Sequence, residues 1–352
     1  MRDVAVVSFA QSKSVRRETD MNEVEMLMPV VHDAVARSGI PKGQIGFTVS
    51  GSSDYLAGGP FSFVSALDAV GAWPPIVESH VEMDGAFALY EAWVKIQTGE
   101  ADSALVYAFG KSSLGDVAEI LTLQLDPYIT APLWPDAVSL AALQARAFLD
   151  ASGKSERDLA AVAARSRRDA KKNPNAQLAG DWTVEKILAE PYLVAPLRKH
   201  DCPPISDGAA AIVLAAGDVA RRACRKPAWI RGIDHRIEPH GLGLRDLARS
   251  RSTAEAGERA GVGKGAVDVA ELHAPFTHQE LLLRDALRLD DKVAVNPSGG
   301  ALAANPVMVA GLVRIGEAAS RIMEGDARRA VAHATSGPCL QQNLVCVLEG
   351  DR

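Results

Sequence analysis

The feature that most constrains the fold is that one order of strands and helices occurs twice along the chain. In the first half, patterns typical of a strand, a helix, a strand, a long helix and two strands occur at 3–9, 23–38, 45–49, 84–98, 104–109 and 209–216. In the second half, the same order occurs at 228–233, 251–260, 267–272, 307–323, 330–335 and 344–348. Glycines close the four helices, namely Gly39, Gly99, Gly261 and Gly325. Two such units predict a duplicated α/β fold whose sheets pack against shared central helices.

The repeat divides the chain into an N-terminal half, residues 1–216, and a C-terminal half, residues 217–352. A segment of about residues 115–198 interrupts the first half and has no counterpart in the second. It contains a helical pattern at 140–151, and we interpret it as a mainly helical insertion. Long insertions of this kind often shape a substrate pocket.

Composition excludes several classes of protein. The 352 residues are 47% hydrophobic and 23% charged, as in an ordinary globular protein, and a net charge of −6 gives no basic footprint for nucleic acid. No run of eighteen apolar residues occurs, so we expect no membrane span. The four cysteines form no Cys-x-x-Cys pair. We therefore expect no metal site and no disulfide framework, and a reducing cytoplasm as the location.

Three motifs resemble the thiolase superfamily, most closely its sterol-carrier-protein-type thiolase or lipid-transfer-protein branch. They are the SDGAAA segment at 206–211, the ELHAPF segment at 271–276 and the NPSGG loop at 296–300. The resemblance covers nearly the whole chain in the right order. It implies the thiolase fold, with duplicated halves in a five-layered αβαβα arrangement. It also implies an acyl-CoA substrate, with CoA as part of the thioester and no bound cofactor.

The chain departs from the family at the catalytic segments. A thiolase carries a nucleophilic cysteine at a helix N-terminus, but the segment here, residues 80–86, reads HVEMDGA and has no cysteine. Asp84 stands near that helix start, where a helix N-cap is favoured over a catalytic role. Asn305 replaces the activating histidine of the family, and its amide can donate to an oxyanion. Cys339 lies close to the family's second cysteine, either as an acid/base or as a buried inert thiol.

The remaining candidates for proton transfer are His273 and His278, because histidine titrates near neutral pH. Each has a plain alternative, as a core histidine or as a surface residue. Together these groups allow a retro-aldol cleavage of a β-hydroxyacyl-CoA. In that reaction one histidine is the base, Asn305 or a backbone N–H holds the enolate oxygen, and Cys339 protonates the α-carbon. The products are a ketone or aldehyde and a shorter acyl-CoA.

The resemblance also implies a type of reaction and possible partner proteins. Thiolase-like proteins of this branch that lack the cysteine are associated with aldolases of bacterial steroid side-chain degradation. Such aldolases act with small OB-fold partner proteins and sometimes with a paralogous thiolase-like subunit. The family implies dimerisation as well, so we expect a homodimer or a heterodimer with such a paralogue.

The sequence contains only weak signals for CoA binding. Lys111, Arg198 and Lys199 are candidates for contacts with its phosphates, and all three are equally readable as solvated loop charges. By resemblance, Ser298 and Gly299 of the NPSGG loop are expected to border the CoA site.

Two other functions stay open beside the lyase. One is a conventional acetyl-CoA acetyltransferase-like acyltransferase, with Cys339 or an unrecognised residue as nucleophile. The other is a non-catalytic lipid-transfer or scaffold subunit paired with an active paralogue. The missing histidine and cysteine suit the scaffold as well as the lyase.

Overall fold

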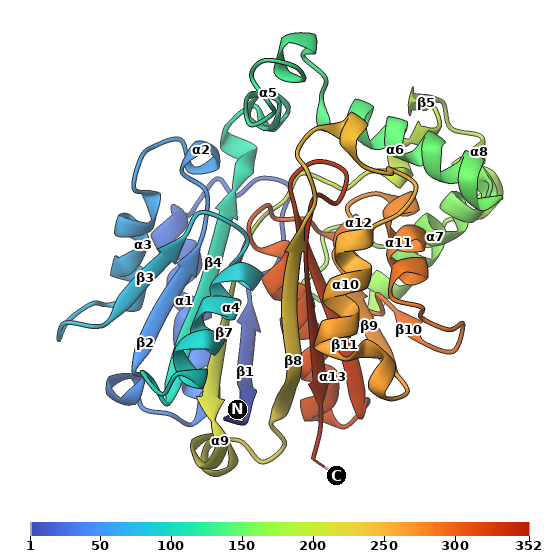
Figure 1. Ribbon diagram of the computed structural model, residues 1–352. Helices are drawn as coiled ribbons and strands as arrows, with labels where there is room; N and C mark the ends of the chain where they lie inside the picture. The colour runs from blue at the N-terminus through green and yellow to red at the C-terminus, as the bar shows by residue number, and fades with distance from the viewer. Residues whose placement is uncertain (1, 352) are drawn as a thin grey trace.

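The computed structural model describes residues 2–351, and both ends of the chain lie at the same end of the molecule (Figure 1). The first half contains β1 (Val4–Gln11), α1 (Glu23–Ser38), β2 (Phe47–Gly51), α2 (Asp54–Ala57), α3 (Ser62–Val70), β3 (Glu78–Val81), α4 (Gly85–Gln97), β4 (Ser103–Lys111) and β7 (Asp207–Ala216). The short α9 (Gly217–Ala223) follows. The second half contains β8 (Ala228–Ile237), α10 (Arg251–Ala260), β9 (Val269–Leu272), α11 (Thr277–Ala286), β10 (Ala294–Val295), α12 (Gly300–Ala303), α13 (Ala310–Glu324), β11 (Arg329–Ser336) and β12 (Gln342–Glu349).

Within residues 2–351, ten strands follow the order β10-β9-β11-β12-β8-β1-β7-β4-β2-β3. The order is symmetric about its centre, because β1, β2, β3, β4 and β7 take the same relative places as β8, β9, β10, β11 and β12. The two halves meet at β1 and β8, which share only the pairs Ala5↔Trp229 and Val6↔Ala228. In each half, the strands next to the outer edge are parallel and the inner ones antiparallel. A boundary near residue 216 fits this symmetry and stays an interpretation.

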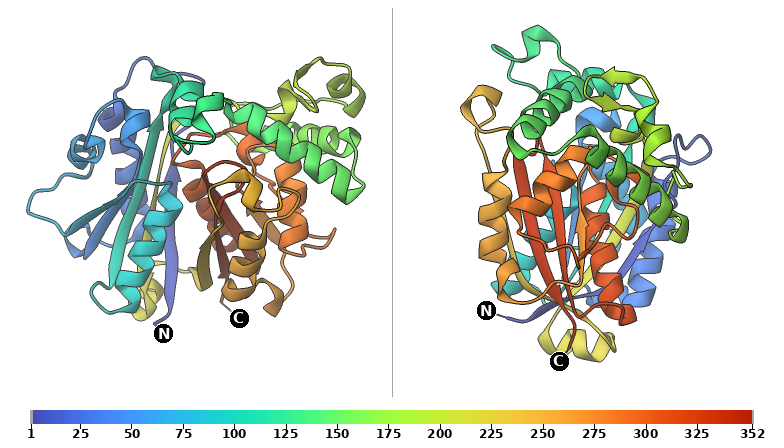
Figure 2. Two further views of the ribbon diagram at one scale, coloured as in Figure 1. Left: turned by 45° about the horizontal axis from the view of Figure 1, so that its top comes forward. Right: turned by 90° about the vertical axis from the view of Figure 1, so that its right-hand side faces the viewer.

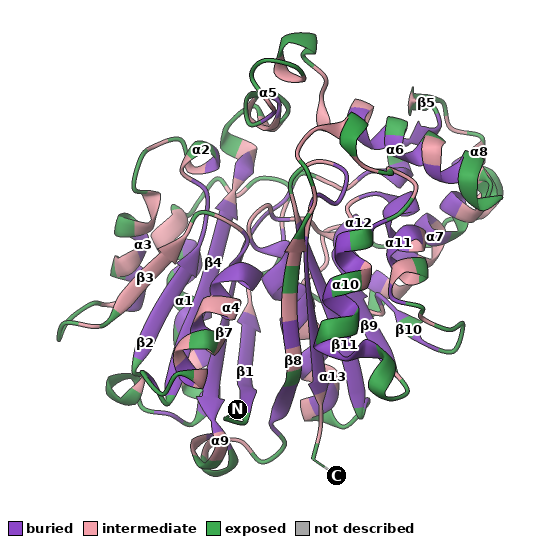
Figure 3. Ribbon diagram, viewed as in Figure 1, coloured by how far each residue is buried: buried purple, intermediate pink, exposed green. Residues whose placement is uncertain are grey.

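Successive side chains of each strand point to opposite faces of the sheet, so the core is divided into layers. Val4, Val6 and Phe9 of β1 pack with α4, α13 and the inner faces of β11 and β12, so the two central helices lie between the halves. The opposite face of β1 packs under α1 and α3, and the outer face of the second half packs under α10 and α11. The central strands are buried along most of their length, while the outer helices expose one side (Figure 3). The expected five-layered αβαβα thiolase fold is confirmed.

The insertion is helical, as expected. It contains α5 (Val117–Leu123), α6 (Ala137–Ser152), α7 (Glu156–Asp169), α8 (Val184–Leu188) and the short strands β5 (Tyr192–Val194) and β6 (Leu197–Arg198). It lies over one end of the sheets, with α6 and α7 above the second half (Figure 2). Phe148 and Leu149 of α6 join the core beneath α10 and α11, which anchors the insertion to the C-terminal half. No helix among the described residues is long and apolar enough to cross a membrane.

Candidate functional site

A cavity of about 440 Å³ lies between the insertion and the loops at the carboxyl ends of the strands. Leu121, Leu125 and Leu140 form part of its wall from the insertion. On the opposite side it is bordered by Asp84, His273, Asn305 and Cys339, four of the five predicted catalytic residues. The fifth, His278, does not border it. The fold thus collects residues that are more than 250 positions apart in the sequence.

Backbone strain is concentrated at this cavity. Met308, Cys339 and Leu340 all border it, and all have positive φ values of 71°, 54° and 60°. Side chains with a Cβ rarely adopt this conformation, which costs on the order of 1–3 kcal/mol per residue. Surrounding contacts must hold the three residues there, as is common at functional sites.

His273 and Asn305 form a hydrogen-bonded pair at the cavity. His273 follows β9, and its Nε2 lies 3.1 Å from Oδ1 of Asn305. The backbone N–H of Thr335 donates to Nδ1 of His273 at 3.4 Å. Because Nδ1 accepts, the proton of the neutral ring is on Nε2, which then donates to the Asn305 carbonyl. This contact turns the Asn305 NH₂ group away from His273 and leaves it available as a donor.

Burial lowers the pKa of His273 to about 4, and Arg314 adds to this effect while the contact with Asn305 opposes it. The ring is therefore neutral at pH 7 and carries its proton on Nε2. In this state it acts as a hydrogen-bond donor that orients Asn305, and its other nitrogen is already occupied. The pair suits oxyanion stabilisation better than proton removal.

Cys339 lies in the β11–β12 connection, and its side chain is buried against α6. Its Sγ contacts the carbonyl oxygen of Leu140 at 3.4 Å. Burial raises the pKa of the thiol to about 11. Two side chains fix the loop, because Arg245 donates to the Cys339 carbonyl at 2.8 Å and Gln144 donates to it at 3.1 Å. Cys339 is thus a protonated thiol held in place, which is suited to donate a proton and poorly suited to attack a thioester.

Asp84 is a shared cap for both central helices. Its carboxylate accepts the N–H of Ala86 in α4 at 2.9 Å, and those of Gly311 and Leu312 in α13 at 2.8 and 3.0 Å. A Cβ on Gly311 would lie 2.5 Å from Oδ1 of Asp84, so only glycine permits this approach. Burial raises the pKa of the Asp84 carboxyl, and the three backbone donors partly offset that effect. The favoured reading as an N-cap fits these contacts.

His278 lies in α11, a helix that was not among the elements predicted from sequence. Its ring is fully buried, and its Nε2 contacts Oε1 of Gln144 at 3.1 Å. Burial lowers its pKa to about 3. Since Gln144 also donates to the Cys339 carbonyl, His278 supports the cavity wall from behind. The structure does not bring it to the reacting groups.

The predicted CoA contacts are not brought together. Arg198 is paired with Glu156 at 2.6 Å within the insertion, and Lys199 is exposed beside it. Lys111 donates to the Met21 carbonyl at the end of β4. None of the three borders the cavity.

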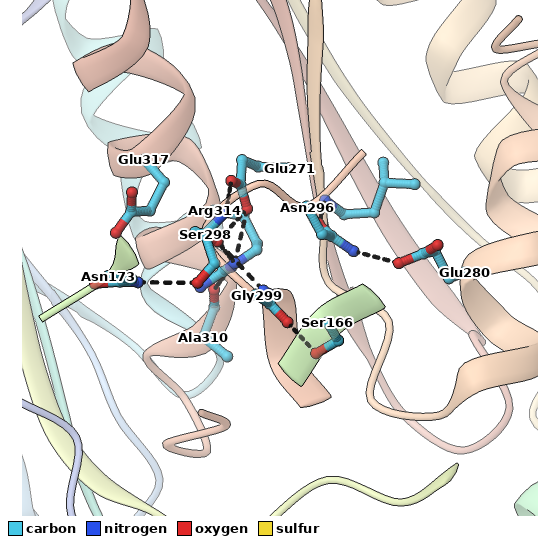
Figure 4. Close-up of polar contacts among 12 residues, drawn as sticks. Ser166, Asn173, Glu271, Glu280, Asn296, Ser298, Gly299, Ala310, Arg314 and Glu317 are labelled. Carbon is cyan, nitrogen blue, oxygen red and sulfur yellow. Dashed lines mark hydrogen bonds and ion pairs between the residues drawn. The ribbon is translucent and has the colours of Figure 1, made fainter. Parts of the chain in front are cut away.

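Residues of the NPSGG loop take part in a buried cluster of hydrogen bonds and ion pairs (Figure 4). The Glu271 carboxylate accepts the N–H and hydroxyl of Ser298 at 3.1 and 2.7 Å, and it pairs with Arg314 at 2.7 Å. Ser166 of α7 donates to the Gly299 carbonyl at 2.6 Å. The NPSGG loop therefore holds the insertion against the second half of the fold. Neither Ser298 nor Gly299 borders the cavity.

A second, more open hollow of about 1070 Å³ lies next to the cavity. Five arginines border it, namely Arg236, Arg245, Arg249, Arg251 and Arg288, together with four carboxylates, namely Glu238, Asp246, Glu255 and Asp285. Arg245 connects the two spaces, because its guanidinium donates to the carbonyls of Pro338 and Cys339 on the cavity wall. Sequence reasoning missed this group. The cluster at 245–251 was the available signal, but Arg236 and Arg288 join it only in the folded chain.

His240 is a further residue that sequence reasoning missed. It is half-buried in the loop between β8 and α10 and borders the cavity. Its Nδ1 lies 3.3 Å from Oε1 of Gln341. No motif contains it, and only the pairing of β8 with β12 places it beside the Cys339 loop.

Comparisons with known proteins find similar chains among thiolases and related proteins. No protein-family model matches the sequence. The chain is 28% identical to an acetyl-CoA acetyltransferase of Methanothermobacter thermautotrophicus, over 92% of this chain and 94% of that protein. It is 25% identical to sterol carrier protein 2 of Gallus gallus, over 71% of this chain but only 54% of that longer protein.

Two further similarities concern lyases. The chain is 33% identical to the 17-hydroxy-3-oxo-4-pregnene-20-carboxyl-CoA lyase of Mycobacterium tuberculosis over 150 residues, which are 40% of this chain and 39% of that protein. A solved structure described as an Ltp2-ChsH2(DUF35) aldolase superposes with a TM-score of 0.83, covering 99% of this chain and 98% of that chain at 19% identity. At that identity the likeness concerns the fold. Together with the motifs and the five layers, these similarities support the thiolase superfamily, and its sterol-carrier-protein-type branch, as the family of this chain.

Proposed function

We propose that this protein cleaves β-hydroxyacyl-CoA thioesters by a retro-aldol reaction that yields a ketone or aldehyde and a shorter acyl-CoA. The observation that carries the proposal is that the cavity combines oxyanion donors with a protonated thiol but lacks an activated nucleophile. The pKa of Cys339 is raised to about 11, and Asp84 is engaged by two helix ends. Thiolysis needs an attacking sulfur, whereas retro-aldol cleavage needs none.

The chemistry follows from the groups at the cavity. A base removes the β-hydroxyl proton, the oxygen electrons form the new carbonyl, and the Cα–Cβ bond breaks. Its electrons pass to the thioester as an enolate, whose oxygen is held by the Asn305 amide. The Cys339 thiol then gives a proton to the α-carbon and is reprotonated afterwards. Substrate and products balance, because one proton moves from oxygen to carbon.

The arginine-bordered hollow supports a CoA thioester as substrate. Guanidinium groups bind phosphates well. Arg245 borders this hollow and also contacts the wall of the cavity. We propose that the CoA phosphates lie there and the acyl group in the 440 Å³ cavity, whose apolar wall suits a bulky ring system such as a steroid nucleus. Lys111 and Lys199 border neither space, so this placement of CoA does not use them.

We further propose a dimer formed along β3. This strand is the outermost of its half and pairs only with β2 among the described strands. Exposed apolar side chains lie around it, namely Tyr55, Phe61, Val64, Trp73 and Val77. An unpaired strand edge beside exposed apolar groups favours association. The partner is a second copy or a paralogue, and an OB-fold protein is a second candidate partner. The name of the aldolase structure pairs Ltp2 with a second component, ChsH2(DUF35).

The test is a product assay with a steroid-bearing β-hydroxyacyl-CoA, with purified protein alone and with a candidate OB-fold partner. Equal amounts of ketone and short acyl-CoA are expected, and the analogue without the β-hydroxyl should give neither. Asn305→Ala should lower product formation by about 10²–10³-fold, while Cys224→Ala, which alters a partly buried thiol that does not border the cavity, serves as the control. Acyl transfer to free CoA would favour the acyltransferase instead. No product, together with a tight complex with a thiolase-like chain, would favour the scaffold.

A further inference from the structure

We propose that His240 is the general base that removes the β-hydroxyl proton, an inference that rests on the proposed retro-aldol function. His240 borders the cavity that contains Asn305 and Cys339. It lies on the loop after β8, in a part of the chain that no motif of the family singled out.

The contacts of Gln341 determine which nitrogen of His240 carries the proton. The backbone of Gln341 accepts the Glu238 N–H at 2.9 Å, and its side-chain Nε2 donates to the Glu238 carbonyl at 3.2 Å. A carbonyl only accepts, so the amide cannot be flipped. Oε1 of Gln341 therefore faces Nδ1 of His240 at 3.3 Å, and this nitrogen must donate. The proton of neutral His240 is on Nδ1, which leaves a lone pair on Nε2.

His240 and His273 are held in opposite tautomers. Nδ1 of His273 accepts the Thr335 N–H, and its Nε2 donates to Asn305, so both of its nitrogens are engaged. His240 has one engaged nitrogen and one free for a proton. These are the two histidines among the described residues that border the cavity, and the surroundings assign one as a donor and the other as an acceptor.

The other titratable groups at the cavity are unsuited to accept the proton. Both carboxylate oxygens of Asp84 accept backbone N–H groups at the starts of α4 and α13. Cys339 is a buried thiol that keeps its own proton. The remaining polar side chains there are amides and hydroxyls, which are very weak bases. His240 is the one described side chain at the cavity that has a free lone pair on an imidazole nitrogen.

In the proposed step, Nε2 of His240 takes the hydroxyl proton as the Cα–Cβ bond breaks, which gives an imidazolium and an enolate. Cys339 protonates the α-carbon, and the imidazolium returns a proton to the Cys339 thiolate through solvent. The enzyme is thereby restored with no oxidant or co-reactant.

The experiment compares His240→Ala and His240→Gln with the unsubstituted protein, using the β-hydroxyacyl-CoA assay with and without added imidazole. A lost general base lowers kcat by about 10²–10⁴-fold. Imidazole should restore at least about tenfold in His240→Ala, where it fills the vacated space, and should have no effect on His240→Gln. His235→Ala, which removes an exposed histidine of β8, is the matched control and should keep full activity.

A second measurement does not depend on turnover. Nitrogen NMR of histidine-labelled protein, with the His240→Gln variant to assign the signal, should show the proton of His240 on Nδ1 and that of His273 on Nε2. A proton on Nε2 of His240 would overturn the proposal. Full activity of both variants beside an active parent would also overturn it while leaving the retro-aldol function intact. An inactive parent would instead overturn the proposed function, and the role of His240 with it.

Discussion

Nε2 of His273 donates to Oδ1 of Asn305 across 3.1 Å, which leaves the Asn305 amide hydrogens directed away from the histidine. The family has an activating histidine where this chain has Asn305, so a proton acceptor has been replaced by a group that can only donate or accept hydrogen bonds. The pair is suited to the oxyanion role that we propose, because neither member takes up a proton at pH 7 in this arrangement.

We therefore expect Asn305→Ala to lower kcat for enolate formation by about 10²–10³-fold with little change in KM. Asn305→Asp should be at least as damaging, because a carboxylate would repel the enolate. Steady-state kinetics of acyl-CoA cleavage measure both values. A variant in which only KM rises would show that Asn305 binds substrate and does not stabilise the transition state.

Cys339 should resist alkylation at neutral pH. Burial raises its pKa to about 11, so the reactive thiolate is scarce below about pH 9. Cys224 is only partly buried and should be labelled first by iodoacetamide. Mass spectrometry of partially labelled protein gives the order, with Cys224→Ser as control. Rapid labelling of Cys339 at pH 7 would instead indicate an activated nucleophile and would favour the acyltransferase.

Asp84→Ala should destabilise the fold by about 2–4 kcal/mol, since it removes the acceptor for three buried backbone N–H groups at two helix starts. Asp84→Asn retains one acceptor oxygen and should cost about half as much. Denaturant unfolding measures the difference. Equal stability of all three proteins would show that the shared cap contributes nothing.

Acid should weaken the fold through three buried histidines. Burial lowers the pKa of His273 to about 4, and of His278 and His333 to about 3, against 6.5 in the unfolded chain. The unfolded state thus binds more protons below pH 6.5. The stability supplied by the neutral rings is complete above that pH and is lost as pH falls toward 3–4, by at most about 4 kcal/mol per pH unit for three groups.

Unfolding of the wild type and of His278→Gln between pH 7.5 and 5 tests this expectation. The slope of the variant should be smaller by up to about 1.4 kcal/mol per pH unit as the pH approaches 5, which is the contribution of one proton. His235→Gln, at an exposed position, should leave the slope unchanged. Identical slopes for wild type and His278→Gln would mean that His278 can take a proton in the folded state.

The proposed dimer gives a further prediction. Trp73 is 84% exposed beside β3, and Trp73→Glu should weaken self-association by at least about 2 kcal/mol, or about thirtyfold in Kd. Leu193→Glu changes an apolar residue of the insertion that is also exposed, at 57%, and should have no effect. Sedimentation over a range of concentrations measures both. Loss of the dimer in the control alone would place the interface on the insertion.

The parts of the fold with strong local signals were predictable from sequence. The bounds of α1 and α10 match their periodic patterns and closing glycines, Gly39 and Gly261. The α11 helix was missed because Phe276 at its N-cap position is not a typical capping residue, and because buried Gln279 and Glu280 disguise its apolar face. Those polar residues are accommodated by partners from the insertion, Gln144 and Arg165, which no local pattern can reveal.

The residues of the candidate site were likewise only partly predictable from sequence. Asp84, His273, Asn305 and Cys339 were found because they occupy motif positions, and they do border one cavity. His240 and the arginines around the second hollow have no motif, and they meet the site only through pairing of β8 with β12. Ser298 and Gly299 belong to a motif, but their polar atoms are used within the protein itself.

The insertion forms one side of the cavity, while the repeated core supplies the opposite side with its polar groups. In the proposed reaction, the part of the chain that meets the acyl group is therefore different from the part that breaks the bond. Residues such as Leu121 and Leu125 can change in size without disturbing the strands that hold His273 and Asn305. A family built on this plan can acquire new substrates by altering one segment, and exchange of residues 115–140 between relatives is the direct way to redirect the enzyme toward a different acyl chain.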